Sequence, residues 1–326
     1  MEHTQAHSRP RASRQKQAKK HRKRRTNMSQ PPWVIVGTGA IGSILGARLL
    51  QQQQSVYFVT RSEATEAHLQ VTGHTQLTGP VQTVHQGTLQ QLPANAVWVF
   101  PVKAWQLASA LTSYQSALSQ AQHIIISHNG LGAAEEALQP YQGKLIDWVT
   151  THGGWRKEKY HTVHSGMGQN WLGMRHGEQA APTWWPLWQQ AFSSEWEPHI
   201  ALRRWHKLAI NCAINPLATL ANSPNGELQK PHYQADIQAV CEEVSALMQQ
   251  ALPQHTQPVR AENLYQHVQQ VIAGTAENIN SMLQDVRAKR PTEVDYLNGF
   301  VHKKGRQLHV PTPVNSRLWQ AILALN

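Results

Sequence analysis

Apolar and polar positions follow a strand, turn and helix rhythm over the first two thirds of the chain. Short apolar runs, typical of buried strands, lie at residues 33–36, 55–60, 96–102, 123–127 and 144–150. The segments between them are of helix length. Residues 43–53, for example, place Ile44, Leu45, Leu49 and Leu50 on one helix face. Strands that alternate with helices predict an α/β fold with a doubly wound parallel sheet.

The pattern changes near residue 198. Beyond it, helical periodicity continues through residues 203–215, 233–250, 261–287, 293–307 and 315–325, and no strand stands out. Residues 274–282 form a polar interruption of one long helix, which is expected to put Asn278 and Ser281 on one face. Pro291 and Glu293 mark the start of the next helix. We therefore predict a sheet domain at residues 31–198 and an all-helical domain at residues 199–326.

Composition indicates the class of protein and the compartment in which it is expected. With 326 residues the chain is long enough for two cores, and it contains no apolar run long enough to span a membrane. Cys212 and Cys241 form no C-x-x-C motif and no metal-ligand spacing. We expect two reduced, buried thiols, no metal site and a cytoplasmic location.

The net charge of +11 is concentrated at the N-terminus. Residues 1–27 hold ten of the thirty Lys and Arg but one acidic residue, Glu2, which is +9 and leaves +2 for the rest. Such a segment cannot bury a core, so residues 1–30 are predicted to be a disordered tail. Two interpretations stay open: an arm for RNA or another anionic surface, or a start-site artefact with translation beginning at Met28. The tail has no aromatic residues for base stacking, so nucleic-acid binding is expected only through its charge, if at all.

A glycine-rich turn follows the first strand. Gly37-Thr38-Gly39-Ala40-Ile41-Gly42 matches a dinucleotide-binding pattern, in which glycines allow a tight turn, close approach of a pyrophosphate and close helix packing. These six residues are therefore the predicted cofactor loop of a Rossmann-type domain. Thr60, Arg61 and Ser62 lie at the end of the second strand, where an NAD site would carry an acid. A guanidinium suits a 2′-phosphate, so the pattern favours NADP.

A row of polar residues marks the first predicted helix of the second domain. Lys207, Asn211 and Asn215 are four apart on an otherwise apolar helix and share one face. A buried polar stripe needs a partner, and a small polar substrate held against the cofactor would supply it. Two further motifs follow strand ends at the ligand-binding edge of the sheet: Val102-Lys103-Ala104-Trp105-Gln106 and Ser127-His128-Asn129-Gly130.

Together these motifs resemble the 2-dehydropantoate 2-reductase (ketopantoate reductase) family. The likeness extends from residue 33 to about residue 320. Its motifs are Asn129-Gly130, Thr150-Thr151-His152-Gly153, His164-Ser165-Gly166-Met167-Gly168, residues 207–217, Asn225-Gly226-Glu227-Leu228, residues 281–285 and residues 292–299. His128 before the Asn-Gly pair, Gly154-Trp155 and the basic tail depart from the family pattern.

The resemblance implies NADPH-dependent reduction of a small 2-oxoacid, 2-dehydropantoate, to (R)-pantoate, a step toward pantothenate and coenzyme A, by a monomer or homodimer. It makes Lys207 the general acid and places Glu293 in the catalytic set where cofactor and substrate meet. The implied substrate contacts are Lys207, Asn211, Asn215, Asn225, Asn278 and Ser281, and the implied cofactor contacts beyond residues 37–42 and Arg61 are Lys103, Gln106, Asn129, Gly153 and Glu293.

The chemistry agrees with these roles. Hydride addition turns a ketone oxygen into an alkoxide, which an ammonium stabilises and then protonates. Neutral Asn and Ser donors hold a 2-oxoacid without competing for the charge of Lys207. Two alternatives stay open: a reductase of another branched 2-oxoacid, and a nucleic-acid-associated NADP-binding sensor. A sensor has no need of a general acid, which counts against the second.

Deleting residues 1–27 tests the interpretation of the tail. We expect a chain that starts at Met28 to fold, bind NADPH and reduce 2-dehydropantoate as the full chain does, because the tail has no predicted place in the site. Any retained RNA or DNA should be lost with the deletion and should fall steeply with salt in the full chain. Activity, circular dichroism and the absorbance ratio of nucleic acid to protein are the measurements. Loss of activity with the fold intact would contradict the expectation.

Overall fold

The structure, a computed structural model, describes residues 30–61, 67–177, 180–252 and 259–325. Residues 1–29 of the predicted tail lie outside the described residues, as does Ser62 of the predicted 2′-phosphate site. Within the described part of the chain, no helix is both long and apolar enough to cross a membrane.

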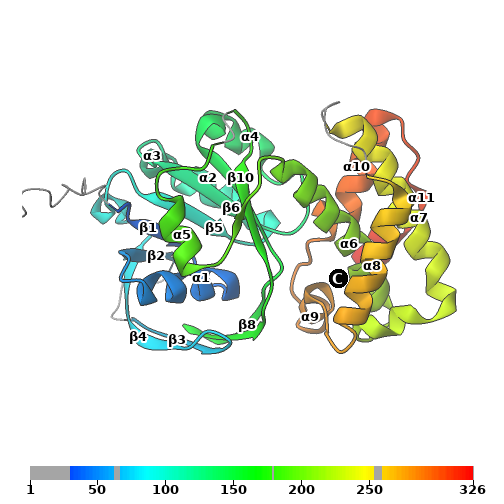
Figure 1. Cartoon of the computed structure of the whole chain (residues 1–326), viewed down its shortest axis with the longest axis horizontal. Helices are drawn as coiled ribbons and strands as arrows, with labels where there is room; N and C mark the ends of the chain where they lie inside the picture. Colours follow the sequence, from blue (N-terminus) through cyan, green and yellow to red (C-terminus); the bar gives the residue numbers. More distant parts are fainter. Residues whose placement is uncertain (1–29, 62–66, 178–179, 253–258, 326) are drawn as a thin grey trace, which may run out of the picture. The chain divides into compact units, whose positions relative to one another are not determined.

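A single mixed sheet forms the first half of the fold (Figure 1). Its centre contains the five predicted strands: β1 (Trp33–Val36), β2 (Val56–Thr60), β5 (Val97–Pro101), β6 (His123–Ser127) and β7 (Leu145–Thr150). These strands pair in parallel, with Ile35 opposite both Phe58 and Val99. The order along the whole sheet is β11-β10-β7-β6-β5-β1-β2-β4-β3-β9-β8. The predicted fold class is confirmed at this centre.

The outer strands were not predicted. They are β3 (Ala67–Gly73), β4 (Leu77–His85), β8 (Gly153–Glu158), β9 (His161–Gly166), β10 (Asn170–Met174) and β11 (Glu195–Trp196). The pairs β3–β4, β8–β9 and β7–β10 are antiparallel. The prediction of a helix-length segment between the second and third predicted strands is wrong, because buried Ala67, Leu69 and Val71 alternate with exposed His68 and Gln70. This alternation is typical of a strand with one buried face and one solvent-exposed face.

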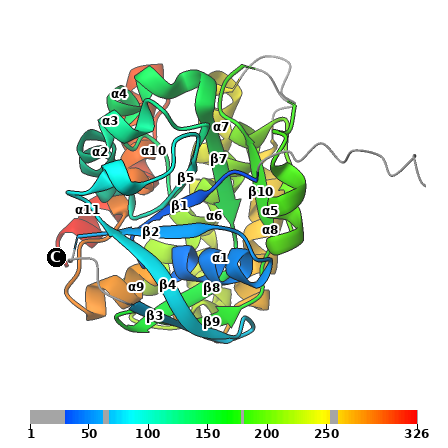
Figure 2. The same cartoon turned by 90° about the vertical axis from the view of Figure 1, so that its left-hand side faces the viewer.

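Helices cover both faces of the sheet: α1 (Ala40–Gln51), α2 (Ala104–Ser113), α3 (Gln115–Leu118), α4 (Glu135–Leu138) and α5 (Trp185–Ala191), with 3₁₀ turns at Leu89–Gln91 and Gln139–Lys144. Alternate residues of β1 face opposite layers. Trp33 and Ile35 pack in the core with α1 and α5, whereas Val34 and Val36 pack in the core with α2 and α3. Figure 2 shows these two groups of helices on opposite sides of β1 and β2.

The second half of the fold is helical, with its own apolar core. Its helices are α6 (Ile200–Leu220), α7 (Pro231–Ala251), α8 (Ala261–Gly274), α9 (Ser281–Arg287), α10 (Asn298–Leu308) and α11 (Pro313–Leu323), with 3₁₀ turns at Asn225–Gln229 and Val294–Tyr296.

Two details of the helical prediction are wrong. Residues 261–287 are not one helix, because α8 ends at Gly274 and α9 begins after Asn280, whose side chain accepts a hydrogen bond from the Leu283 amide at 3.0 Å. Asn278 therefore lies in the connection and not on a helix face with Ser281. Glu293 does not begin a long helix either. It precedes a short 3₁₀ turn, and α10 begins only at Asn298.

Candidate active site

A cavity of about 1410 Å³ lies at the carboxyl ends of the central strands. The sheet half contributes the glycine turn, Arg61, Lys103, Gln106, Asn129 and residues 150–156, and the helical half contributes Lys207, Asn225, Asn278, Ser281 and Glu293. Most of the predicted site residues therefore face one cleft. Asn211 and Asn215 do not line it. They lie further along α6, where Asn215 is buried.

The glycine turn has the space that a phosphate group needs. Gly37 has a φ of +80°, which favours glycine, and an added Cβ there would meet nothing within 4 Å. At Gly39 an added Cβ would come no closer than 3.7 Å to the Pro101 carbonyl oxygen. Gly42 faces inward instead, where a Cβ would lie 2.9 Å from the Pro101 ring and 3.1 Å from Ile35. The first two glycines thus leave the surface open, and the third allows α1 to pack on the sheet.

Lys207 projects from α6 to the end of β7. Its ammonium donates a hydrogen bond to the Thr150 carbonyl oxygen at 2.9 Å. Burial lowers the pKa of Lys207 to about 8, although the Glu293 carboxylate acts in the opposite direction. A carbonyl oxygen holds the ammonium in place without neutralising it, so the proton can be given up near neutral pH.

Glu293 connects the two halves of the fold. Its buried carboxylate accepts hydrogen bonds from the Ala104 amide at 3.1 Å, the Asn129 amide at 3.3 Å and the Asn129 side-chain amide at 2.8 Å. Ala104 is the first residue of α2, so Glu293 satisfies a free N–H at the start of that helix. The prediction that Glu293 lies at the start of its own helix is thus wrong. Glu293 caps α2, a helix of the other half of the fold.

Lys103 lies beside the same carboxylate. Its Nζ is 2.6 Å from Asp285 Oδ2 and 3.5 Å from Glu293 Oε2. Burial alone would lower the pKa of Lys103, but the charges of Glu293 and Asp285 outweigh burial and raise it. Lys103 is therefore a fixed cation. The sequence reasoning gave Asp285 no role. The available signal was an acid two and three residues after the apolar Leu283 and Met282, which are buried, on a predicted helix.

Amide side chains line the helical wall of the cleft. Asn225 donates a hydrogen bond to Thr275 Oγ1 at 3.0 Å, and Asn280 donates one to Asn225 Oδ1 at 3.4 Å. The Asn225 amide also bonds the Asn278 carbonyl oxygen at 3.0 Å. This bond holds the 3₁₀ turn against the connection between α8 and α9. Thr275 and Asn280 were missed as site residues, because their neighbours in space are about fifty residues away in sequence.

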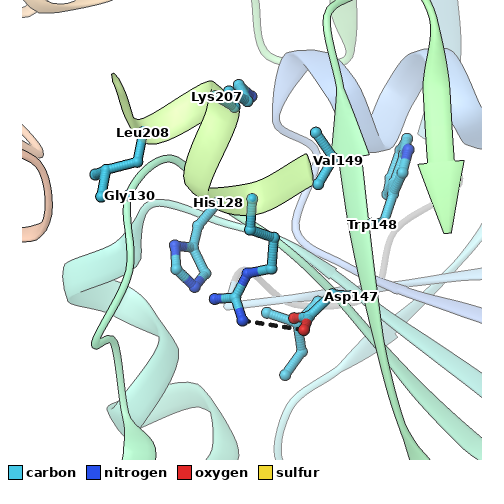
Figure 3. A pocket seen from close by; sticks show the side chains of 9 residues that line it. His128, Gly130, Asp147, Trp148, Val149, Lys207 and Leu208 are labelled. Carbon is cyan, nitrogen blue, oxygen red and sulfur yellow. Dashed lines mark hydrogen bonds and ion pairs between the residues drawn. The ribbon is translucent and has the colours of Figure 1, made fainter. Parts of the chain in front are cut away.

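A second, small pocket of about 20 Å³ lies beside Lys207, with room for one water molecule (Figure 3). His128, Asp147 and Lys207 reach it from the end of β6, from β7 and from α6. Asp147 binds Arg204 at 3.0 Å and Arg175 at 2.6 Å. Burial, with the charge of Arg204, lowers the pKa of His128 to about 4, so this ring is neutral at pH 7. Lys207 therefore has polar and charged neighbours on this side.

Both halves of the chain match known protein families. The family described as ketopantoate reductase PanE/ApbA matches residues 33–177, and its C-terminal counterpart, ketopantoate reductase PanE/ApbA C terminal, matches residues 199–326. The chain belongs to the ketopantoate reductase family. The predicted family and the predicted enzyme class, an oxidoreductase, are confirmed.

Individual relatives agree. A 2-dehydropantoate 2-reductase of Shigella flexneri is 39% identical over 223 residues, which are 68% of this chain and 71% of that protein. One of Vibrio cholerae is 34% identical over 298 residues, 90% of this chain and 97% of that protein. The solved structure of D-mandelate dehydrogenase with NADH and anilino(oxo)acetate has a TM-score of 0.79 at 20% identity, covering 90% of this chain and 98% of that one. This last likeness shows the shared fold.

The coupling between Glu293 and Lys207 is testable. Glu293→Gln removes the carboxylate that raises the pKa of Lys207, so we expect this pKa to fall further below about 8. The measurement is the pH dependence of amine acetylation at Lys207, followed by mass spectrometry.

Asp285→Asn is the matched control. It removes a partner of Lys103 at 2.6 Å, but its charge is not among those that shift the pKa of Lys207. The midpoint for Lys207 should therefore stay in place in this variant. An unchanged midpoint in Glu293→Gln would contradict the coupling.

Proposed function

We propose that this protein reduces 2-dehydropantoate to (R)-pantoate with NADPH, and that Lys207 is the general acid. The observation that carries the proposal is the place of Lys207. Its ammonium lies at the carboxyl end of β7, in the same cavity as the glycine turn. Residues 31–198 then hold the cofactor, and residues 199–326 supply the acid and most of the substrate contacts.

The residues present fit the cofactor. The open surface over Gly37 and Gly39 accepts a pyrophosphate, and the backbone N–H groups at the start of α1 point toward it. Arg61 lines the cleft just after β2, where it would pair with a 2′-phosphate. Bound NADPH supplies a hydride to the carbonyl carbon of the substrate.

Lys207 performs the proton transfer. Its ammonium stabilises the negative charge that develops on the carbonyl oxygen and then donates a proton to it, which gives the hydroxyl of the product. Its lowered pKa makes that donation easier than from an ordinary lysine. Thr150 holds the ammonium before substrate arrives, so little reorganisation is needed.

The amides opposite Lys207 suit a hydroxylated 2-oxoacid. Asn225, Asn278 and Ser281 line the cleft and offer neutral donors and acceptors to a carboxylate and a hydroxyl. Lys103 and Glu293 occupy the join between the two halves, where Lys103 supplies a permanent positive charge. We assign Asn211 and Asn215 a supporting role in this proposal, because they lie on α6 beyond the residues that line the cleft.

The direct test is a spectrophotometric assay of NADPH oxidation with 2-dehydropantoate and a panel of other branched 2-oxoacids. We expect the highest kcat/KM for 2-dehydropantoate. A clear preference for another 2-oxoacid would keep the mechanism but overturn the substrate. No oxidation with any of them would overturn the proposal.

Lys207→Ala should lower kcat by roughly 100- to 10,000-fold while NADPH still binds, because the acid is lost and the cofactor cradle is not. Lysine donates only when protonated, so kcat of the unmodified protein should be highest below about pH 8 and fall above it. Steady-state kinetics across pH and fluorescence titration with NADPH are the measurements. Near-normal turnover in the variant would make Lys207 structural.

Cofactor preference is tested at Arg61. Arg61→Ala should weaken NADPH binding by about tenfold to a hundredfold and leave NADH binding little changed, since a charged hydrogen bond contributes roughly 1.5–3 kcal/mol. Arg156→Ala is the control, a cation that lines the same cavity from β8. Equal affinity of the unmodified protein for the two cofactors would contradict the assignment.

A further inference from the structure

A chain of hydrogen bonds leads from α1 to the cleft. Arg48 Nε donates to Thr75 Oγ1 at 2.8 Å, Thr75 Oγ1 lies 2.8 Å from His164 Nδ1, and His164 Nε2 lies 2.9 Å from His152 Nδ1. Thr75 and His164 are buried, whereas His152 lines the cavity. The proposed reaction uses none of these four side chains.

The direction of the chain follows from its neighbours. His164 Nε2 also lies 3.1 Å from the Gly166 carbonyl oxygen, which can only accept, so the proton of His164 is on Nε2. His164 Nδ1 then accepts from the Thr75 hydroxyl, whose oxygen accepts from the permanently charged Arg48. The opposite assignment would set two lone pairs against each other at Gly166.

The same logic fixes His152. Its Nδ1 shares the His164 Nε2–H with the Gly166 carbonyl oxygen as a second acceptor, so its own proton must be on Nε2, the nitrogen that points away from His164. Burial, with the nearby His164 and Arg48, lowers the pKa of His152 to about 4, and burial lowers the pKa of His164 too. Both rings are therefore neutral at pH 7. Phe192 packs against His152 in a tilted arrangement, with ring centroids 4.6 Å apart, and restrains its orientation.

The place of His152 indicates its ligand. It lies two residues after Thr150, whose carbonyl oxygen holds Lys207. The carbon that receives hydride is bonded to the oxygen that Lys207 protonates, so the nicotinamide must bind beside this stretch. A nicotinamide carries one strong uncharged acceptor, its carboxamide oxygen. A neutral N–H donor suits that group in both the oxidised and the reduced cofactor.

We propose that His152 donates its Nε2–H to the carboxamide oxygen of the nicotinamide, and that His164, Thr75 and Arg48 are positioning residues that keep the proton on that nitrogen. The inference rests on the proposed function, because it needs a nicotinamide cofactor in the cleft. It adds a binding residue that selects the nicotinamide end of the cofactor by a hydrogen bond.

The first test is binding. His152→Phe keeps a flat ring against Phe192 and removes the donor, so NADPH should bind about fivefold to tenfold more weakly, as for one lost hydrogen bond between uncharged groups. Adenosine 2′,5′-bisphosphate, which has no nicotinamide, should bind as before. His123→Phe is the control. The pKa of His123 is also lowered to about 4, but His123 is at the amino end of β6, whereas the cleft is at the carboxyl end. Isothermal titration gives each Kd.

A cofactor analogue identifies the acceptor. Thionicotinamide adenine dinucleotide phosphate has sulfur, a weaker acceptor, in place of the carboxamide oxygen. Its affinity should therefore differ little between the unmodified protein and His152→Phe. An equal loss for NADPH and for the analogue would overturn the assignment of the acceptor.

The positioning residues need a readout of their own. Thr75→Val removes the hydroxyl but not the volume, and it should weaken NADPH binding less than His152→Phe does. In the double variant Thr75 should have no further effect, because it acts only through His152, whereas independent structural roles would add. Nitrogen-15 NMR of labelled histidines in the free protein should show protonated Nε2 at both His152 and His164.

Each result decides the matter. Unchanged NADPH binding in His152→Phe, or a proton on His152 Nδ1, overturns the inference. Equal weakening of NADPH and adenosine 2′,5′-bisphosphate shows that the ring supports the fold, and a loss confined to the 2-oxoacid assigns the donor to the substrate. If the unmodified protein binds no NADPH, the proposed function has failed before this inference is tested.

Discussion

The buried carboxylate of Glu293 is the constraint on which the arrangement of the cleft depends. A buried charge is stable only when donors surround it, and these donors come from the start of α2, from the loop after β6 and from Lys103. All three belong to the sheet half, whereas Glu293 belongs to the helical half. The hydrogen bonds to this one carboxylate therefore fix the position of the helical half against the sheet half at the cleft. The charge of the same carboxylate also raises the pKa of Lys207, against the effect of burial.

Two partly buried lysines near this carboxylate have pKa values shifted in opposite directions. Lys103 has two carboxylates within 3.5 Å, and its pKa is raised. Lys207 has a neutral carbonyl oxygen as its partner, so burial prevails and lowers its pKa to about 8. The choice of partner thus separates a permanent cation, suited to holding negative charge, from an acid that can give up its proton. The division of labour is electrostatic and requires no difference in side-chain chemistry.

The sequence predicted what depends on local spacing. The glycine turn, the five central strands and the exposure of Lys207 to the cleft all follow from residues close together in the chain. What it missed depends on contacts between distant segments. Of the outer strands, β3, β4 and β9 carry several Gln, His and Thr residues, and β3 is paired with β9, about ninety residues away. The residues next to Asp285 and His152 in sequence do not indicate roles for these two side chains. Asp285 is joined to the cleft through its ion pair with Lys103, and His152 is oriented by its hydrogen bond with His164. Helical spacing put Asn211 and Asn215 on one face with Lys207 but could not show where along α6 the cleft ends.

Two contacts between α6 and β7 fix the position of Lys207. Arg204 of α6 binds Asp147 of β7, and Lys207 of α6 binds Thr150 of β7. The two partners are three residues apart on the helix and three residues apart on the strand. Three residues span ~4.5 Å along a helix but ~10 Å along a strand, and the long side chains bridge this difference. A buried ion pair of this kind adds little net stability because desolvation offsets the attraction, yet it excludes other registers of α6 on β7. The ammonium is thus held by the sheet itself before any substrate binds; in the proposed reaction, this is the condition for stabilising an alkoxide without reorganisation.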